Sequence, residues 1–153
     1  MDDQLKEILQ QAGVSPRDSS WYYKAFTHRS YLNEAKSVID SNERLEFLGD
    51  AILSFIISSY LFEVRAQDEE GDLTNLRAFI VKTEALSKIS RNLNLGQFLK
   101  LSKGEELSAG RENPQLLANT YEALIGAIFL DLGIEAATKF VHITLLPLFE
   151  IEI

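Results

Sequence analysis

The chain has 153 residues, 46% of them hydrophobic and 25% charged, which is enough to bury the core of one soluble domain. It contains no cysteine, which excludes disulfides and thiolate metal sites. The net charge of −8 argues against a general nucleic-acid binder, whose surface is usually basic, but not against an acidic enzyme that holds cations. The N-terminus lacks a signal-peptide layout, and the longest uncharged run, residues 51–62, is too short to cross a bilayer. We therefore expect a cytoplasmic chain with no membrane partner.

The first third of the chain predicts two helices and a turn. Residues 2–11 carry apolar side chains on one side, and Gly13 is placed to end that helix. Residues 21–26 are rich in aromatic side chains and should pack inward. Residues 25–34 predict a short helix followed by a capped turn.

A long apolar helix over residues 41–62 is the centre of the prediction. Only Glu46 and Asp50 carry charge between residues 45 and 62, and a helix that is apolar nearly all round is typically buried. At 100° per residue, these two acids and Glu43 fall within about 60° of one another on one face. A buried carboxylate without a partner is costly, so we expect a cation, most simply a metal ion, to meet them.

Glu43 also has a purely structural interpretation. If Asp40 is the N-cap of the long helix, Glu43 occupies the third helical position, which is the spacing of a capping box. An acid at that position complements the helix dipole and needs no role in binding. Both interpretations of Glu43 remain open on the sequence.

The remainder of the chain predicts an acidic turn, one polar loop and further helical segments. The acidic turn covers residues 67–72, with Asp72 as the cap of the helix that follows. The helical segments are residues 73–92, 95–99, 115–132 and 134–149. In the polar loop, residues 101–114, Lys103 and Arg111 could contact phosphates or simply face solvent. No segment alternates as a strand does, so the predicted fold class is an all-α, multi-helix domain.

The two most apolar helices each carry oxygen side chains at helical spacing. Glu46 and Asp50 are four residues apart, and Asn119 and Glu122 are three apart, so each pair shares a helix face. Oxygen ligands from facing helices suit hard cations such as Mg²⁺ or Mn²⁺. Many helices carry two acids at this spacing on a solvated face, however, and spacing alone does not exclude that alternative.

Five segments of the chain stand out in order: THRSY at residues 27–31, NERLEFLGD at 42–50, EEGDL at 69–73, KGEE at 103–106 and LANTYEALIGAIFLDL at 117–132. Together they resemble the motifs of the ribonuclease III family, the endonucleases that cut double-stranded RNA. The resemblance extends from about residue 21 to residue 133 and implies the fold of the ribonuclease III endonuclease domain, working as a homodimer. It implies one catalytic domain over residues 1–153, without the basic double-stranded-RNA-binding domain that follows in most family members.

The resemblance also implies an activity. Family members are Mg²⁺-dependent endoribonucleases that hydrolyse both strands of double-stranded RNA, including ribosomal precursors. Their products carry 5′-phosphate and 3′-hydroxyl ends with two-nucleotide 3′ overhangs. Mn²⁺ is expected to substitute for Mg²⁺, and no small-molecule cofactor is expected. The wide minor groove of A-form RNA suits recognition by shape rather than by sequence.

Residue roles follow from the positions that match the family's motifs. The implied metal ligands are Glu46, Asp50, Asn119 and Glu122, and the implied catalytic acids are Asp50 and Glu122. Glu43 and Glu70 match acidic positions that line the family's cleavage valley, where we also place Lys103. Phe47 matches an aromatic residue that inserts into the partner subunit.

Asn119 departs from the family pattern, which usually has Asp at this position. Asn keeps one carbonyl oxygen for a metal but lacks the negative charge, so cation affinity should fall. Two interpretations follow: an active enzyme with a raised metal requirement, or a catalytically impaired module that binds double-stranded RNA or serves in assembly. We favour the enzyme because the acids are otherwise all in place, at Glu43, Glu46, Asp50, Glu70 and Glu122. A third hypothesis, independent of the family, is an all-α metal-binding interaction domain.

Overall fold

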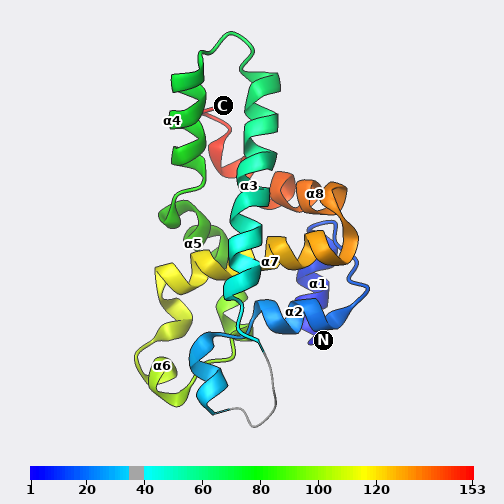
Figure 1. The fold of residues 1–153 in the computed structure, drawn as a ribbon, viewed down its shortest axis with the longest axis vertical. Helices are drawn as coiled ribbons and strands as arrows, with labels where there is room; N and C mark the ends of the chain where they lie inside the picture. Colours follow the sequence, from blue (N-terminus) through cyan, green and yellow to red (C-terminus); the bar gives the residue numbers. More distant parts are fainter. Residues whose placement is uncertain (35–39) are drawn as a thin grey trace.

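A computed structural model of the chain describes residues 1–34 and 40–153 (Figure 1). Its α-helices are α1 Asp3–Gln11, α2 Ser19–Ala25, α3 Glu43–Val64, α4 Glu70–Ile80, α5 Thr83–Asn92, α6 Lys103–Leu107, α7 Pro114–Leu132 and α8 Ile134–Thr144. Its 3₁₀ helices are η1 Arg29–Asn33, η2 Leu95–Phe98, η3 Gly110–Glu112 and η4 Leu146–Phe149. Within these residues there is no strand, only one isolated bridge between Thr27 and Lys100. The predicted all-α fold class is confirmed.

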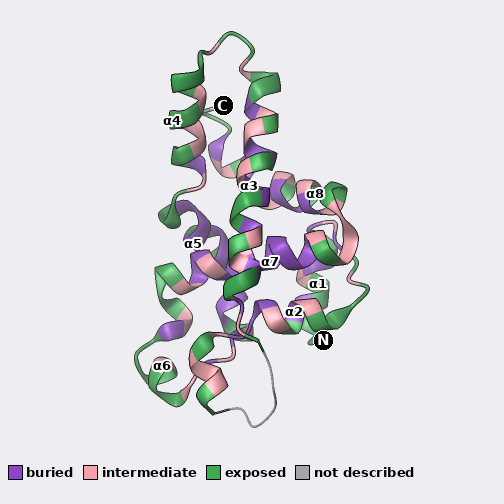
Figure 2. Cartoon of the chain, in the orientation of Figure 1, coloured by how far each residue is buried: buried purple, intermediate pink, exposed green. Residues whose placement is uncertain are grey.

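Helix α7 forms the centre of the molecule. It packs against α3, α5, α2 and α8, and ten of its 19 residues are buried (Figure 2). Asn113 caps its first turn, because the side-chain Oδ1 accepts from the backbone N–H groups of Gln115 and Leu116. Gly133, with φ of 96°, ends it in a conformation that suits glycine.

Helix α3 lies across α7 and is buried on one side only, so the prediction of a fully buried helix is wrong. Seven of its 22 residues are buried. On the opposite side Phe47, Phe55 and Phe62 are 80%, 61% and 77% exposed. The sequence predicts burial from apolar content, but in one copy of this chain no described element covers the face of α3 opposite α7. By length and composition α3 could also cross a membrane, which is weak evidence because core helices meet the same criteria.

Two glycines allow α3 and α7 to cross with their backbones in contact. A Cβ atom on Gly126 would lie 2.5 Å from the carbonyl oxygen of Leu45, and one on Gly49 would overlap the carbonyl oxygen of Glu122. Real Cβ atoms do not approach backbone oxygens this closely, so any side chain at either position must push the helices apart. The crossing therefore places the acids of α3 next to the polar residues of α7.

Three predicted elements differ from the structure. The helix predicted over residues 73–92 is two helices, α4 and α5, which meet at Val81 and Lys82, and Glu69 rather than Asp72 precedes the first. The polar loop 101–114 contains α6 and η3, and the predicted helix 134–149 is divided into α8 and η4. The first division has a packing cause: α4 packs against α3, whereas α5 packs against α7.

The residue at which α3 begins excludes the capping box predicted between Asp40 and Glu43. The helix begins at Glu43, after Asn42, whose buried side chain donates to the carbonyl oxygen of Ala25 at 3.1 Å. Asp40 instead forms an ion pair with Lys24 at 3.6 Å. The Ser41 hydroxyl donates to the Glu43 carboxylate at 3.0 Å. Glu43 is therefore the first helical residue rather than the third.

Candidate metal centre and cleavage site

The crossing of α3 and α7 brings Glu46, Asp50, Asn119 and Glu122 together. Glu46 Oε1 lies 3.2 Å from the side-chain amide of Asn119. Glu122 and Asp50 lie within hydrogen-bond reach of each other, and this proximity contributes to a raised pKa of Glu122. The pair on α3, Glu46 and Asp50, thus lies opposite the pair on α7, Asn119 and Glu122. Four oxygen-bearing side chains from two helices form one cluster, which we call the acidic cluster.

The acidic cluster holds more negative charge than the protein neutralises. Burial raises the pKa of Glu122 to about 9, and its hydrogen bond with Asp50 and the charges of Asp50 and Glu46 contribute to the rise. The pKa of Glu46 is raised by burial and then by the charges of Glu43 and Asp50. Among the described residues, no Lys, Arg or His forms an ion pair with any of these carboxylates.

The donor set of the acidic cluster fits a divalent cation. All its candidate ligands are carboxylate or amide oxygens, which Mg²⁺ and Mn²⁺ prefer, and a bound cation would lower the raised pKa values. Within residues 1–34 and 40–153, no three Asp, Glu or His side chains are already gathered at metal-ligand spacing. Binding would therefore require side chains of the acidic cluster to rotate and Glu122 to lose its proton.

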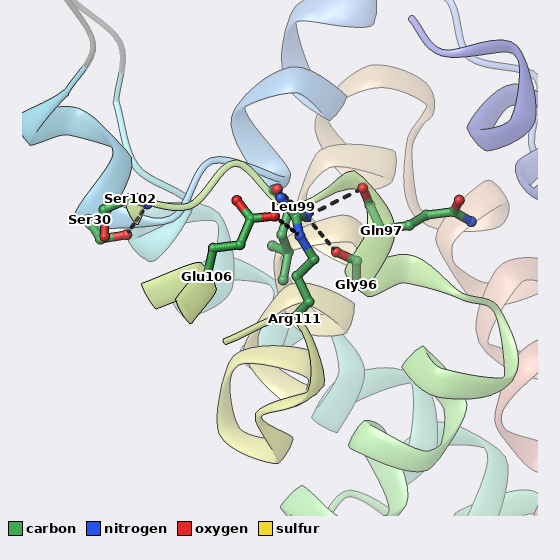
Figure 3. Close-up of polar contacts among 7 residues, drawn as sticks. All are labelled: Ser30, Gly96, Gln97, Leu99, Ser102, Glu106 and Arg111. Atoms are coloured by element: carbon green, nitrogen blue, oxygen red, sulfur yellow. Dashed lines mark hydrogen bonds and ion pairs between the residues drawn. The ribbon is translucent and has the colours of Figure 1, made fainter. Parts of the chain in front are cut away.

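Glu43 begins α3 beside the acidic cluster, whereas Lys103 begins α6 next to η1. The charge of Glu43 acts on Glu46, as described above, and also on His28, whose pKa is lowered chiefly by burial. Lys103 begins α6, is exposed, and uses its backbone N–H to donate to Glu34 Oε1 at 3.1 Å. The α6 segment and η1 are joined where Ser30 Oγ accepts from the backbone N–H of Ser102 at 3.0 Å (Figure 3).

One interpretation of the sequence is that Arg111 contacts phosphates. In the structure its guanidinium group is instead bonded to groups of the same chain. Its Nη1 donates to the carbonyl oxygens of Gly96, Gln97 and Leu99 at 3.1, 3.4 and 2.7 Å. Its Nε pairs with Glu106 Oε1 at 3.0 Å (Figure 3). The guanidinium group thus holds η2 against the segment of α6 and η3, and its role is structural.

Glu70 does not join the acidic cluster within one chain. Helix α3 has 22 residues, which is about 33 Å of rise, and Glu70 follows its far end as the first residue of α4 (Figure 1).

The expected dimer residue, Phe47, is exposed on the outer face of α3 together with Phe55 and Phe62. Phe55 and Phe62 are not among the residues expected from the sequence, although their spacing of eight and seven residues places all three on one helical face.

Comparison with known proteins identifies the family of this chain. A family model described as ribonuclease-III-like matches residues 18–148. The chain is 46% identical to ribonuclease 3 of Anoxybacillus flavithermus over 144 residues, 94% of this chain and 60% of that protein. It is also 46% identical to ribonuclease 3 of Streptococcus gordonii over 141 residues, 92% of this chain and 61% of that protein. The chain thus spans about 60% of the length of these relatives.

Two solved structures of the nuclease domain of ribonuclease III from Campylobacter jejuni are similar over almost their whole length. One has a TM-score of 0.87 and 38% identity, covering 97% of this chain and 98% of that domain. The other, described for structural flexibility in the region involved in dimer formation, has a TM-score of 0.85 and 40% identity, covering 93% and 96%. The matched residues, the shared fold and the sequence identity show that the chain belongs to the ribonuclease III family of endoribonucleases.

Proposed function

We propose that residues 1–153 are a catalytic domain that hydrolyses double-stranded RNA with Mg²⁺, or with Mn²⁺ in its place, as a homodimer in the cytoplasm. Its products would be 5′-phosphate and 3′-hydroxyl ends with two-nucleotide 3′ overhangs, formed in RNA processing. The observation that carries the proposal is the acidic cluster, where Glu46 and Asp50 of α3 meet Asn119 and Glu122 of α7 without a cation from the described chain.

The residues of the acidic cluster would have two roles, cation binding and proton transfer. Glu46, Asp50, Asn119 and Glu122 would hold the cation through their side-chain oxygens. When bound, a divalent cation lowers the pKa of water and offsets the charge that develops on the phosphate. Asp50 and Glu122 lie within hydrogen-bond reach of each other, so they can orient the attacking water and accept its proton. No covalent intermediate with the enzyme is needed.

The outer face of α3 supports a homodimer. Phe47, Phe55 and Phe62 expose aromatic surface that a second copy could cover, with Phe47 inserting into that copy. Because Glu70 lies at the far end of α3 from the acidic cluster of its own chain, we expect it to line the cleavage valley beside the site of the other copy. Two sites in one dimer would cut one strand each.

A cleavage assay tests the proposal. Long duplex RNA incubated with the chain and millimolar Mg²⁺ should yield short duplexes with 5′-phosphates, and single-stranded RNA of the same sequence should stay intact. Glu122→Gln removes an acid of the cluster and should lower the rate by about 10²-fold or more. Glu7→Gln, the same change at an exposed position of α1, should have no effect. Intact duplex after incubation of the wild type with Mg²⁺ and with Mn²⁺ would exclude the proposal.

A second candidate function is a duplex-RNA-binding or assembly module without catalysis, and Asn119 is the observation that favours it. If the chain is instead an enzyme, Asn119→Asp adds a negative charge beside Glu46 and should lower the Mg²⁺ concentration needed for half-maximal cleavage. Duplex binding that persists in EDTA, without cleavage in any divalent cation, would favour the module. An unchanged Mg²⁺ titration for Asn119→Asp would mean that Asn119 is not a ligand.

A further inference from the structure

A cavity of about 840 Å³ lies between α1, α2 and the segment around η2. Its walls include six aromatic and aliphatic side chains: Leu5, Tyr22, Tyr23, Phe26, Phe98 and Leu99. The rings of Phe26 and Phe98 meet edge to face, with their centroids 5.8 Å apart. No residue of the acidic cluster lines this cavity. Its volume and its mainly apolar walls are typical of sites that bind small organic ligands.

Lys100 places a positive charge at the wall of this cavity. Its Nζ lies 3.8 Å from the centroid of the Tyr23 ring, and burial lowers its pKa. Among the described residues no carboxylate forms an ion pair with Lys100, and residues 35–39 contain no Asp or Glu. The ammonium group therefore loses part of its hydration, and the attraction of one aromatic ring offsets only part of that loss.

The backbone around Lys100 holds this side chain at the cavity. Its N–H donates to the carbonyl oxygen of Phe26 at 2.8 Å, and its carbonyl oxygen accepts from the N–H of His28 at 3.1 Å. These two bonds belong to the isolated bridge between residues 27 and 100. Because the main chain is fixed on both sides of Lys100, binding of a ligand here requires little ordering of the chain.

The other charged side chains that line the cavity already have partners. Asp2 and Asp18 cap α1 and α2, where they accept from backbone N–H groups at 2.8 and 3.0 Å. Asp40 forms an ion pair with Lys24 at 3.6 Å. Lys100 is thus the charged group at which an incoming anion would gain most, whereas the three carboxylates would oppose a ligand with several negative charges.

We propose that this cavity binds a small organic monoanion with a flat apolar body, of the class of aromatic carboxylates. Its carboxylate would pair with Lys100 and offset the cost of burying the ammonium group. Its flat body would lie against the aromatic walls of the cavity, where edge-to-face and offset contacts are favourable. The site requires neither a metal ion nor RNA, so it is independent of the proposed nuclease function.

Three probes that share one flat body and differ in charge test the proposal: 2-naphthoate, the neutral 2-naphthamide and the cationic 2-naphthylmethylammonium. In ¹H–¹⁵N NMR titrations of the whole chain, 2-naphthoate should shift the amide signals of Tyr23, Phe98 and Lys100 with a dissociation constant of about 1 mM or below. The other two probes should bind at least about 5-fold more weakly, because they cannot pair with an ammonium group. Equal or tighter binding of either probe, or no shift of these three signals with 2-naphthoate, would overturn the proposal.

Substitution of Lys100 tests which group selects the charge of the ligand. Lys100→Met should weaken 2-naphthoate binding by about 5- to 10-fold and remove the preference over 2-naphthamide, the effect of losing one charged hydrogen bond. Lys100→Arg keeps the charge and should keep the preference. Lys88→Met, the same loss of charge at an exposed position of α5, should change nothing.

A preference for 2-naphthoate that persists in Lys100→Met would overturn the assignment of the anion to Lys100. Circular dichroism verifies that this variant is folded. The comparison of the three probes on the wild type needs no variant, so it decides whether the cavity selects an anion even if Lys100→Met does not fold.

Discussion

At the scale of single residues, Glu122 is the group whose chemistry depends most on the fold. On α7 it is only half-buried, but Asp50 and Glu46 approach it from α3, and its pKa rises from 4.5 to about 9. In the metal-free protein Glu122 is therefore protonated at neutral pH. Protonation of Glu122 removes one negative charge from beside Asp50 and Glu46, and a bound cation would offset that charge instead.

This raised pKa predicts how stability depends on pH. The folded protein holds the Glu122 proton more tightly than the unfolded chain, so the contribution of that proton to stability is complete below pH 4.5 and is lost as pH rises through about 9. In EDTA, the melting temperature of the wild type should fall between pH 6 and pH 9 more steeply than that of Glu122→Gln. Saturating Mg²⁺ should reduce the difference. Parallel pH profiles of the two proteins in EDTA would show that Glu122 titrates normally.

At the scale of elements, the α3–α7 crossing determines the geometry of the acidic cluster. Gly49 and Gly126 allow the two backbones to touch, and this contact brings Asp50 and Glu122, 72 residues apart in the sequence, within hydrogen-bond reach. The helical spacing of each pair could be read from the sequence, and the structure brings the pairs together. The glycine contact could not be read, because it depends on which faces of two distant helices meet.

Widening this crossing should impair both stability and metal binding. In Gly126→Ala the new Cβ would meet the carbonyl oxygen of Leu45 at 2.5 Å, and a backbone atom cannot rotate away. Overpacking of this kind costs about 1–3 kcal/mol, so we expect a lower free energy of unfolding and a weaker Mg²⁺ affinity. Chemical denaturation and calorimetry would measure both.

Gly71→Ala is the matched control for Gly126→Ala. Gly71 also lies in a helix, but a Cβ there has nothing within 4 Å. It should leave metal binding unchanged and stabilise the protein by about 0.5–1 kcal/mol, because Ala favours helix over Gly. If Gly126→Ala behaved like Gly71→Ala, the close crossing of α3 and α7 would not determine the geometry of the acidic cluster.

The division of the predicted helix 73–92 is another consequence of packing between elements. Leu76 and Ile80 are four residues apart and share a face, whereas Leu86 follows Ile80 by six residues, about 240° around a continuous helix. One straight helix could not direct both groups to the core, since α4 packs on α3 and α5 packs on α7. The change of face can be read from the sequence, but the apolar content of residues 73–92, taken alone, predicts one continuous helix.

At the scale of the whole molecule, the exposed aromatic residues of α3 predict self-association. Phe55→Glu places a charge in the middle of the face formed by Phe47, Phe55 and Phe62, and should raise the dimer dissociation constant by about 30-fold or more, the effect of losing an interface hot spot. Sedimentation velocity over a concentration series would measure this, with circular dichroism to verify folding.

Leu107→Glu provides the control for that experiment. Leu107 is 89% exposed but lies on α6, away from the aromatic face of α3, so its substitution should leave the dimer intact. If both variants associated as the wild type does, another surface would form the dimer. If neither the wild type nor the variants associated, the outer face of α3 would need a different explanation.

The sequence by itself determined the all-α class, the two helices that carry the acids, and the family. Helical periodicity fixes which side chains share a face, and it is a local property of the chain. Only the tertiary structure decided that the outer face of α3 stays exposed, that Arg111 is committed to three carbonyl oxygens, and that Glu122 holds its proton. Burial, hydrogen-bond partners and pKa values depend on what packs against a face, and those neighbours come from distant parts of the chain.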